Sequence, residues 1–134
     1  KQKGFDEAIL LDQSGNVSEA PGENIFLIKN SQLITPTISS SALDGITRKS
    51  IITLAQDMGL KVKVRRVDKK ELKLADEIFL SGTAAEITPI IKIDKKKIGN
   101  GKVGKITKSL MTTYANIVMN KNENYSNWLT SVLK

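Results

Sequence analysis

The 134 residues are 40% hydrophobic and 26% charged, which suits a single domain with a buried core. Because the chain contains no cysteine and no histidine, disulfides, Cys/His zinc sites and Ser-His-Asp or Cys-His relays are excluded within it. Only a hard cation on oxygen ligands would remain, and we predict no metal site. The absence of cysteine fits an intracellular protein, and we predict a cytoplasmic location.

Lysine and arginine outnumber the acidic residues by 21 to 14, which gives a net charge of +7. Such a charge attracts polyanions weakly, so a basic polyanion-binding module is one interpretation. However, only 4% of the residues are aromatic, too few for a base-stacking surface, and we predict no nucleic-acid partner. No apolar segment has the length of a membrane span, and we predict no membrane association. Since the first residue is Lys1 and not Met, we expect a piece of a longer protein.

Short strands joined by turns are predicted for the first 36 residues: 5–11, 16–19, 24–29 and 32–35. The segment 16–19 is expected to pair with the first strand of this series. Three later strands are predicted from apolar or alternating runs: 60–67, 77–81 and 87–94. Pro21-Gly22, Asn30-Ser31 and Asp94–Lys97 supply turns between these strands.

A first helix is predicted from a cap at Asp44 to about Met58, with Gly59 ending it. Its expected buried face consists of Ile51, Leu54, Ala55 and Met58. Further helices are predicted over 69–74, 107–119 and 125–133. The fold class is therefore α+β, a strand-rich curved sheet or pseudo-barrel flanked by helices.

Two places near the start of the chain combine polar residues and turns in a way that suits a ligand. Residues 18–24 carry Glu19 and Glu23 around a turn, where a carboxylate can pair with a ligand cation. Residues 43–48 begin the first helix, whose free N–H groups suit an anion, and Gly45 allows close approach. An ordinary solvated turn and an ordinary capped helix remain the alternatives for these two places.

A third place lies at residues 81–86, where a buried strand runs into Gly82-Thr83-Ala84-Ala85. Small residues at the carboxyl end of a strand leave backbone N–H groups accessible to a ligand. A tight turn beside a core strand would have the same sequence. Together the three places suggest a ligand that carries a phosphate and a positively charged ring nitrogen.

Three runs of sequence resemble class IV pyridoxal-phosphate-dependent aminotransferases, most closely the branched-chain amino-acid group: EAILLDQSGNVSEAPGENIFLIKNSQLITP, SSALDGITR and LADEIFLSGTAAEITPI. The resemblance extends from about Gly4 to Tyr114, with the blocks in the family's order. It implies the fold of the family's C-terminal domain and pyridoxal 5'-phosphate as the cofactor. On this likeness, residues 1–134 form one C-terminal cofactor-binding domain, and the family's N-terminal domain lies outside the sequence.

The resemblance also implies roles for individual residues. Glu19 matches the glutamate that pairs with the pyridine nitrogen, and Leu43 matches the residue that packs against the ring. Ile46 and Thr47 match the phosphate-binding helix start, and Thr83 matches a further phosphate contact. The implied cofactor-binding set is Glu19, Leu43, Gly45, Ile46, Thr47, Gly82 and Thr83. The implied substrate-binding pair is Thr83 and Ala84, whose N–H groups match the turn that receives the α-carboxylate.

The sequence departs from the family pattern in two respects. Where the family usually has Gly-x-Gly, this chain has Ala20-Pro21-Gly22, which keeps the spacing from Glu19 to Asn24. The family's Schiff-base lysine lies upstream of the first matching block, so we assign no catalytic residue within the chain. Glu23, Asn24 and Arg48 are assigned to structural support.

The resemblance implies an enzyme that transfers the amino group between leucine, isoleucine or valine and 2-oxoglutarate. Its partners would be branched-chain amino acids, 2-oxo acids, the missing N-terminal domain and further copies in a homodimer or higher homo-oligomer. Without the lysine, this chain alone is expected to be inactive. A D-amino-acid aminotransferase and an aminodeoxychorismate lyase are the alternatives within the family, and the polyanion-binding module is the alternative outside it.

Overall fold

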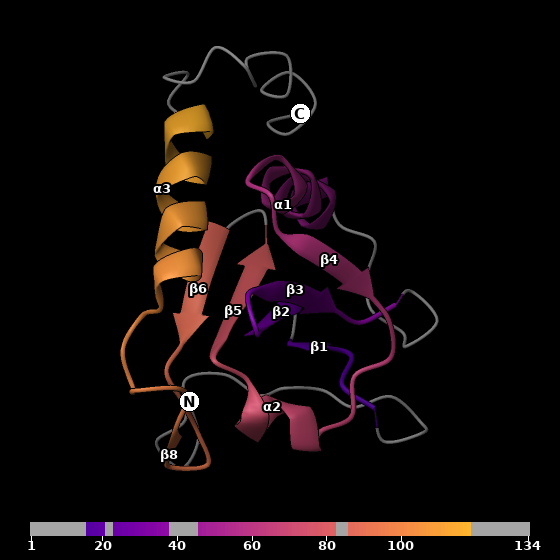
Figure 1. The fold of residues 1–134 in the computed structure, drawn as a ribbon, viewed down its shortest axis with the longest axis vertical. Coiled ribbons are helices and arrows are strands. Elements are labelled where there is room, and N and C mark those ends of the chain that lie inside the picture. The colour runs from indigo at the N-terminus through magenta and orange to yellow at the C-terminus, as the bar shows by residue number, and fades with distance from the viewer. Residues whose placement is uncertain (1–15, 21–22, 38–45, 83–85, 119–134) are drawn as a thin grey trace.

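The computed structural model describes residues 16–20, 23–37, 46–82 and 86–118, in which strands are interspersed with three helices (Figure 1). The elements in chain order are β1 (Glu19–Ala20), β2 (Glu23–Lys29), β3 (Gln32–Thr35), α1 (Ile46–Asp57), β4 (Lys61–Val64), α2 (Lys70–Leu74), β5 (Glu77–Gly82), β6 (Glu86–Ile90), β7 (Lys92–Ile93), β8 (Lys96–Lys97) and α3 (Lys105–Val118). The predicted strand 5–11 and the predicted helix 125–133 lie outside the described residues. Within the described ranges, no helix combines the length and the apolar character that crossing a membrane requires.

Six strands form one mixed sheet in the order β4-β3-β2-β5-β6, with β1 paired to the start of β2. Every pair is antiparallel except β3 and β4, which are parallel. Figure 1 shows a strong twist between the β5–β6 half and the β2–β3 half of the sheet. Because β4 and β6 are the edge strands of this sheet and do not pair with each other, the sheet stays open across the described strands and does not form a barrel. The α+β prediction is confirmed, in the form of a twisted open sheet.

The sheet separates two hydrophobic cores because successive side chains of a strand point to opposite faces. On one face, Phe26 of β2 and Phe79 of β5 stack with their ring centroids 4.9 Å apart. The helices α1 and α3 cover this face through Ile51, Leu54, Ala55, Leu110, Tyr114 and Ile117. The opposite core contains Ile25, Leu27, Ile78 and Leu80, covered by Val17, Val67, Leu72, Ala75 and Ile98. Both faces of β2 and β5 are therefore buried.

Most of the prediction for the first helix is confirmed. Helix α1 ends at Asp57, and Gly59 follows with a φ of 85°, which a residue without a Cβ adopts most readily. Ile51, Leu54 and Ala55 are fully buried, as predicted. The assignment of Met58 to the buried face is wrong, because Met58 lies in the turn beyond the helix and is 41% exposed.

Three predicted strands differ from the structure. The segment predicted as one strand over 60–67 continues only to Val64, the last residue of β4. The segment predicted over 87–94 is split at Ile91, whose carbonyl accepts the N–H of Ile98 and so starts the small β7–β8 hairpin. In the segment predicted over 16–19, Asn16 pairs with Asp68 and Val17 donates to the Val67 carbonyl. Each difference comes from a partner distant in sequence.

The short helix α2 confirms the prediction over 69–74 and is stabilised by local charges. The Arg65 guanidinium donates two hydrogen bonds to the Glu71 carboxylate, at 2.7 and 3.1 Å. The same carboxylate accepts the Asp68 N–H at 2.9 Å. Hydrogen bonding from Arg65 lowers the pKa of Glu71 below its usual range, because it favours the charged form.

The amino-terminal end of α3 is capped by a carboxylate from β5. Glu77 accepts the N–H of Thr107 at 2.7 Å and the N–H of Ile106 at 3.3 Å. A Cβ on Gly104 would collide with the Glu77 side chain, so glycine permits this approach. The carboxylate occupies the end of a helix where the partial charge is positive and N–H groups lack helical partners.

We predict that Glu77→Gln lowers the free energy of unfolding by about 1 kcal/mol, because one charge-assisted hydrogen bond and the favourable helix-dipole interaction are lost. Urea denaturation measures the change. Asp94→Asn, which removes an exposed carboxylate from the β7–β8 turn, is the matched control and should alter stability little. Equal midpoints for the two variants would contradict the capping role of Glu77.

Candidate functional site

The described parts of the three places singled out in the sequence lie at one end of the strands of the main sheet, which we call the sheet edge. The strands β1, β3 and β5 run in one direction, and β2 and β6 run in the other. The connections from β1 to β2 and from β5 to β6, together with the chain that leaves β3, therefore share an edge. Residues 18–24 span the first connection, and residues 81–86 span the second.

The register aligns residues from four strands in one row at this edge. Glu19 of β1 lies opposite Asn24 of β2, Asn24 lies opposite Ser81 of β5, and Ser81 lies opposite Ile87 of β6. Because neighbouring strands are about 4.8 Å apart, the backbone positions of Glu19 and Ser81 are separated by roughly 10 Å. Ser81 is two residues from Phe79, so it lies on the sheet face that α1 and α3 cover.

A buried arginine brings the start of α1 to the same edge. The Arg48 guanidinium donates a hydrogen bond of 3.1 Å to the carbonyl of Pro36, the residue that follows β3. Arg48 and its neighbour Thr47 are only 5% and 4% exposed. Figure 1 shows β5 pointing toward α1, which packs on this strand. The first helical turn is thus fixed beside the strand ends, which agrees with a structural role for Arg48.

The structure places half of the predicted site residues. Glu19 lies in β1, Ile46 and Thr47 begin α1, and Gly82 ends β5. Leu43, Gly45, Thr83 and Ala84 lie outside the described residues. The four placed residues come from three elements whose ends meet at one sheet edge.

The sequence analysis assigned no role to Ser81, but the structure shows that its side chain is in an unusual environment. The side chain is 0% exposed, and its Oγ has no hydrogen-bond partner among the described residues. A buried polar group without a partner costs about 1–3 kcal/mol, and native proteins contain few of them. In the sequence, Ser81 is the first residue of the candidate place at residues 81–86 and follows an apolar run, but no role was assigned to it.

The groups at this edge fit a ligand with an anionic end and a cationic end. The first turn of α1 lies at this edge and has the partial positive charge of a helix start, and the Arg48 guanidinium is buried beside it. The backbone of Glu19, an acidic residue, lies at the other end of the row.

Comparison with known families shows which family the chain belongs to. Residues 1–93 match the model of the family described as Amino-transferase class IV. The chain belongs to this family. The chain is 51% identical over 130 residues to a probable branched-chain-amino-acid aminotransferase of Aquifex aeolicus. It is 45% identical over 129 residues to the branched-chain-amino-acid aminotransferase of Pseudomonas aeruginosa. Each alignment covers 96% of this chain and 42% of the relative, so the chain spans less than half of these relatives' length.

Solved structures of class IV aminotransferases have the same fold. The branched-chain amino acid aminotransferase of Escherichia coli is 42% identical with a TM-score of 0.90, over 93% of this chain and 42% of that chain. The enzyme of Thermobaculum terrenum in its PLP form is 44% identical with a TM-score of 0.90, over 93% of this chain and 41% of that chain. These likenesses confirm the α+β fold expected from the resemblance.

We predict that Arg48→Met lowers the free energy of unfolding by about 1–3 kcal/mol, because the buried Pro36 carbonyl loses its donor. Hydrogen exchange in the first two turns of α1 should also become faster relative to α3. Arg66→Met, at an exposed arginine, provides the matched control. Unchanged exchange in α1 would mean that Arg48 does not fix the helix start.

Proposed function

We propose that this class IV aminotransferase chain is the C-terminal cofactor-binding domain of a cytoplasmic branched-chain amino-acid aminotransferase. The complete enzyme would transfer the amino group between leucine, isoleucine or valine and 2-oxoglutarate, as a homodimer or higher homo-oligomer. One observation carries the proposal: the row Glu19–Asn24–Ser81 and the start of α1 meet at one sheet edge in a chain that is 51% identical to a probable branched-chain-amino-acid aminotransferase.

The proposed cofactor is pyridoxal 5'-phosphate, which supplies an electron sink for the charge that develops on the substrate when its Cα–H proton leaves. Glu19 would hold a proton on the pyridine nitrogen through its negative charge. The N–H groups of Ile46 and Thr47 and the Thr47 hydroxyl would bind the phosphate at the amino-terminal end of α1. The burial of Thr47 and Arg48 supports this role, since hydrogen bonds to an anion are stronger where water is excluded.

The remaining predicted residues complete the proposed site. Leu43 would pack against the ring, and Gly45 would let the phosphate approach the backbone. Gly82 and Thr83 would extend the phosphate site, and the N–H groups of Thr83 and Ala84 would orient the substrate's carboxylate. The catalytic lysine would come from a part of the protein outside this sequence, so we expect residues 1–134 alone to be inactive.

A visible absorbance spectrum of the complete protein tests the proposed function. Bound pyridoxal phosphate should give a yellow band. L-leucine should bleach this band and 2-oxoglutarate, added afterwards, should restore it, whereas D-alanine should leave it unchanged. Bleaching by D-alanine alone would indicate a D-amino-acid aminotransferase instead. The absence of any band, with pyridoxal phosphate supplied, would contradict the assignment of the cofactor.

In the complete enzyme, we predict that Glu19→Gln lowers kcat about 100-fold or more, because the ring nitrogen loses the charge that stabilises its protonated form. The cofactor should stay bound, which its absorbance reports, and KM for L-leucine should change little. Glu71→Gln removes a carboxylate that is paired with Arg65 away from the edge and should leave kcat unchanged. Unchanged turnover in Glu19→Gln would remove Glu19 from this role.

We also predict that Thr47→Val weakens pyridoxal phosphate binding by about 1–2 kcal/mol, the value of one hydrogen bond to a charged group. Fluorescence or absorbance titration of the apo protein measures the dissociation constant. Thr53→Val on the same helix is the matched control, since the Thr53 hydroxyl donates to the Lys49 carbonyl within α1. A dissociation constant equal to that of the control would contradict the phosphate site at the start of α1.

A further inference from the structure

The turn between the β7–β8 hairpin and α3 contains Asn100, the only asparagine of the sequence that is followed by a glycine. Asn100 is exposed, and Gly101 is half-buried. The Lys102 N–H donates a hydrogen bond of 3.0 Å to Oδ1 of Asn100, which holds the carboxamide against the backbone. The Gly101 N–H donates to the Ile98 carbonyl at 2.9 Å and closes the turn. The carboxamide and the backbone nitrogen that follows it therefore lie together in a surface turn.

An asparagine that precedes a glycine is chemically labile. The backbone nitrogen of the following residue can attack Cγ of the asparagine, because the cyclic imide that forms is unstrained. A Cβ on the following residue hinders this attack, and glycine has none. Among the described residues, the one other exposed asparagine is Asn30, which precedes Ser31. Sequence and exposure together therefore distinguish Asn100.

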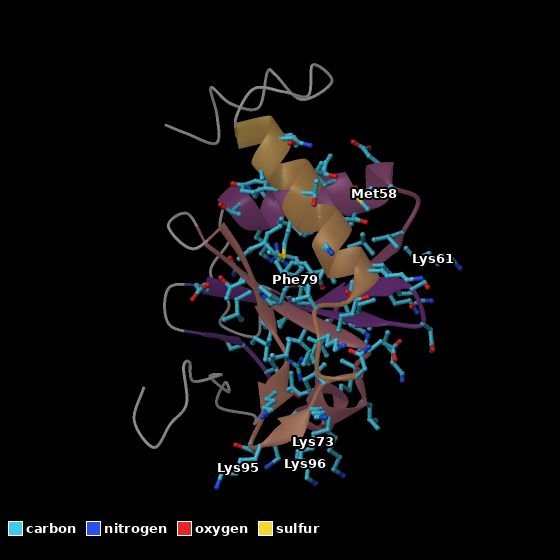
Figure 2. All side chains as sticks on the ribbon, turned by 90° about the vertical axis from the view of Figure 1, so that its left-hand side faces the viewer. Met58, Lys61, Lys73, Phe79, Lys95 and Lys96 are labelled. Atoms are coloured by element: carbon cyan, nitrogen blue, oxygen red, sulfur yellow. The ribbon has the colours of Figure 1, made fainter. Side chains whose placement is uncertain are left out.

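The surroundings of this carboxamide favour the charges that form during the attack. Its oxygen becomes negative when Cγ is attacked, and the Lys102 N–H already donates to that atom. A lysine side chain also passes the turn, since a Cβ built on Gly101 would be only 2.9 Å from Cδ of Lys97. Figure 2 labels two further exposed lysines of the preceding hairpin, Lys95 and Lys96, at one end of the molecule. Positive charge nearby stabilises both the oxyanion and the carboxylate that the reaction leaves.

We propose that Asn100 is a site of spontaneous deamidation in the folded protein. The Gly101 N–H leaves the Ile98 carbonyl when the turn opens, and the nitrogen then forms a bond to Cγ of Asn100. The bond from Cγ to Nδ2 breaks, and the side-chain nitrogen departs as ammonia with the proton that the Gly101 nitrogen gives up. Water opens the cyclic imide at either carbonyl, which leaves aspartate or isoaspartate at position 100. Water is the only co-reactant, and the reaction does not depend on the proposed cofactor.

The modification would change both charge and backbone at the link between the hairpin and α3. A neutral carboxamide becomes a carboxylate beside Lys97 and Lys102. In the isoaspartate product, the backbone also becomes one carbon longer ahead of the helix start that Glu77 caps.

The test incubates the complete protein in mildly alkaline buffer without denaturant and follows Asn100 over time. Trypsin cleaves after Lys97 and Lys102 and so releases residues 98–102 as one peptide. Mass spectrometry measures the conversion of asparagine, and chromatography separates aspartate from isoaspartate. A sample digested at time zero corrects for reaction during digestion. Asn100 should be converted progressively to both products, while Asn30 stays largely intact.

Gly101→Ala should slow the conversion about tenfold or more, because the new Cβ hinders the attacking nitrogen. Gly59→Ala is the matched control, since it also places a Cβ at a positive φ, 85° against 77°, but in a different turn. This control should deaminate Asn100 at the rate of the parent protein. An Asn100 that stays intact, or that yields aspartate alone, would overturn the inference. Equal rates in Gly101→Ala and the parent protein, or equal conversion of Asn30, would overturn it as well.

Discussion

The antiparallel pairing of β2 with β5 holds both hydrophobic cores and the candidate site in register. Its five residue pairs, from Asn24–Ser81 to Ile28–Glu77, are buried along most of their length, and the Phe26–Phe79 stack lies within them. A shift of one residue would move every apolar side chain to the wrong face, so the register is strongly determined. The same register that packs the core therefore decides which residues stand in the row at the edge.

The polar groups at the two ends of β5 differ in their hydrogen bonding. At the amino-terminal end, the Glu77 carboxylate satisfies two N–H groups of α3, so charge and hydrogen bonds are balanced within the chain. At the carboxyl end, Arg48 is buried beside the start of α1, and the Ser81 hydroxyl has no hydrogen-bond partner among the described residues. Contacts within the chain explain the first end, whereas the second end is where we propose that a phosphate binds.

Local signals in the sequence predicted most of the elements, because their causes are local. The turn at Asn30 and Ser31 has positive φ at both residues, 51° and 61°, as a tight hairpin turn requires. The division of 87–94 at Ile91 could not be read from alternation, since it depends on a hydrogen bond from Ile98. For the site, motif resemblance indicated Glu19, which no periodicity identifies. Ser81 belongs to the candidate place at residues 81–86, but only three-dimensional packing shows that its hydroxyl has no partner among the described residues.

The row at the sheet edge also constrains the order of events during synthesis. Glu19 and Asn24 leave the ribosome before Ser81, which joins them only after the helix α1 and three further elements have been made. Contacts between residues so distant in sequence form late, because a long loop must close first. The nascent chain therefore cannot complete this row until β5 has emerged and paired with β2. Until then the apolar residues of β2 lack their central partner strand, and this interval is when the unfinished chain is most open to chaperones and to aggregation.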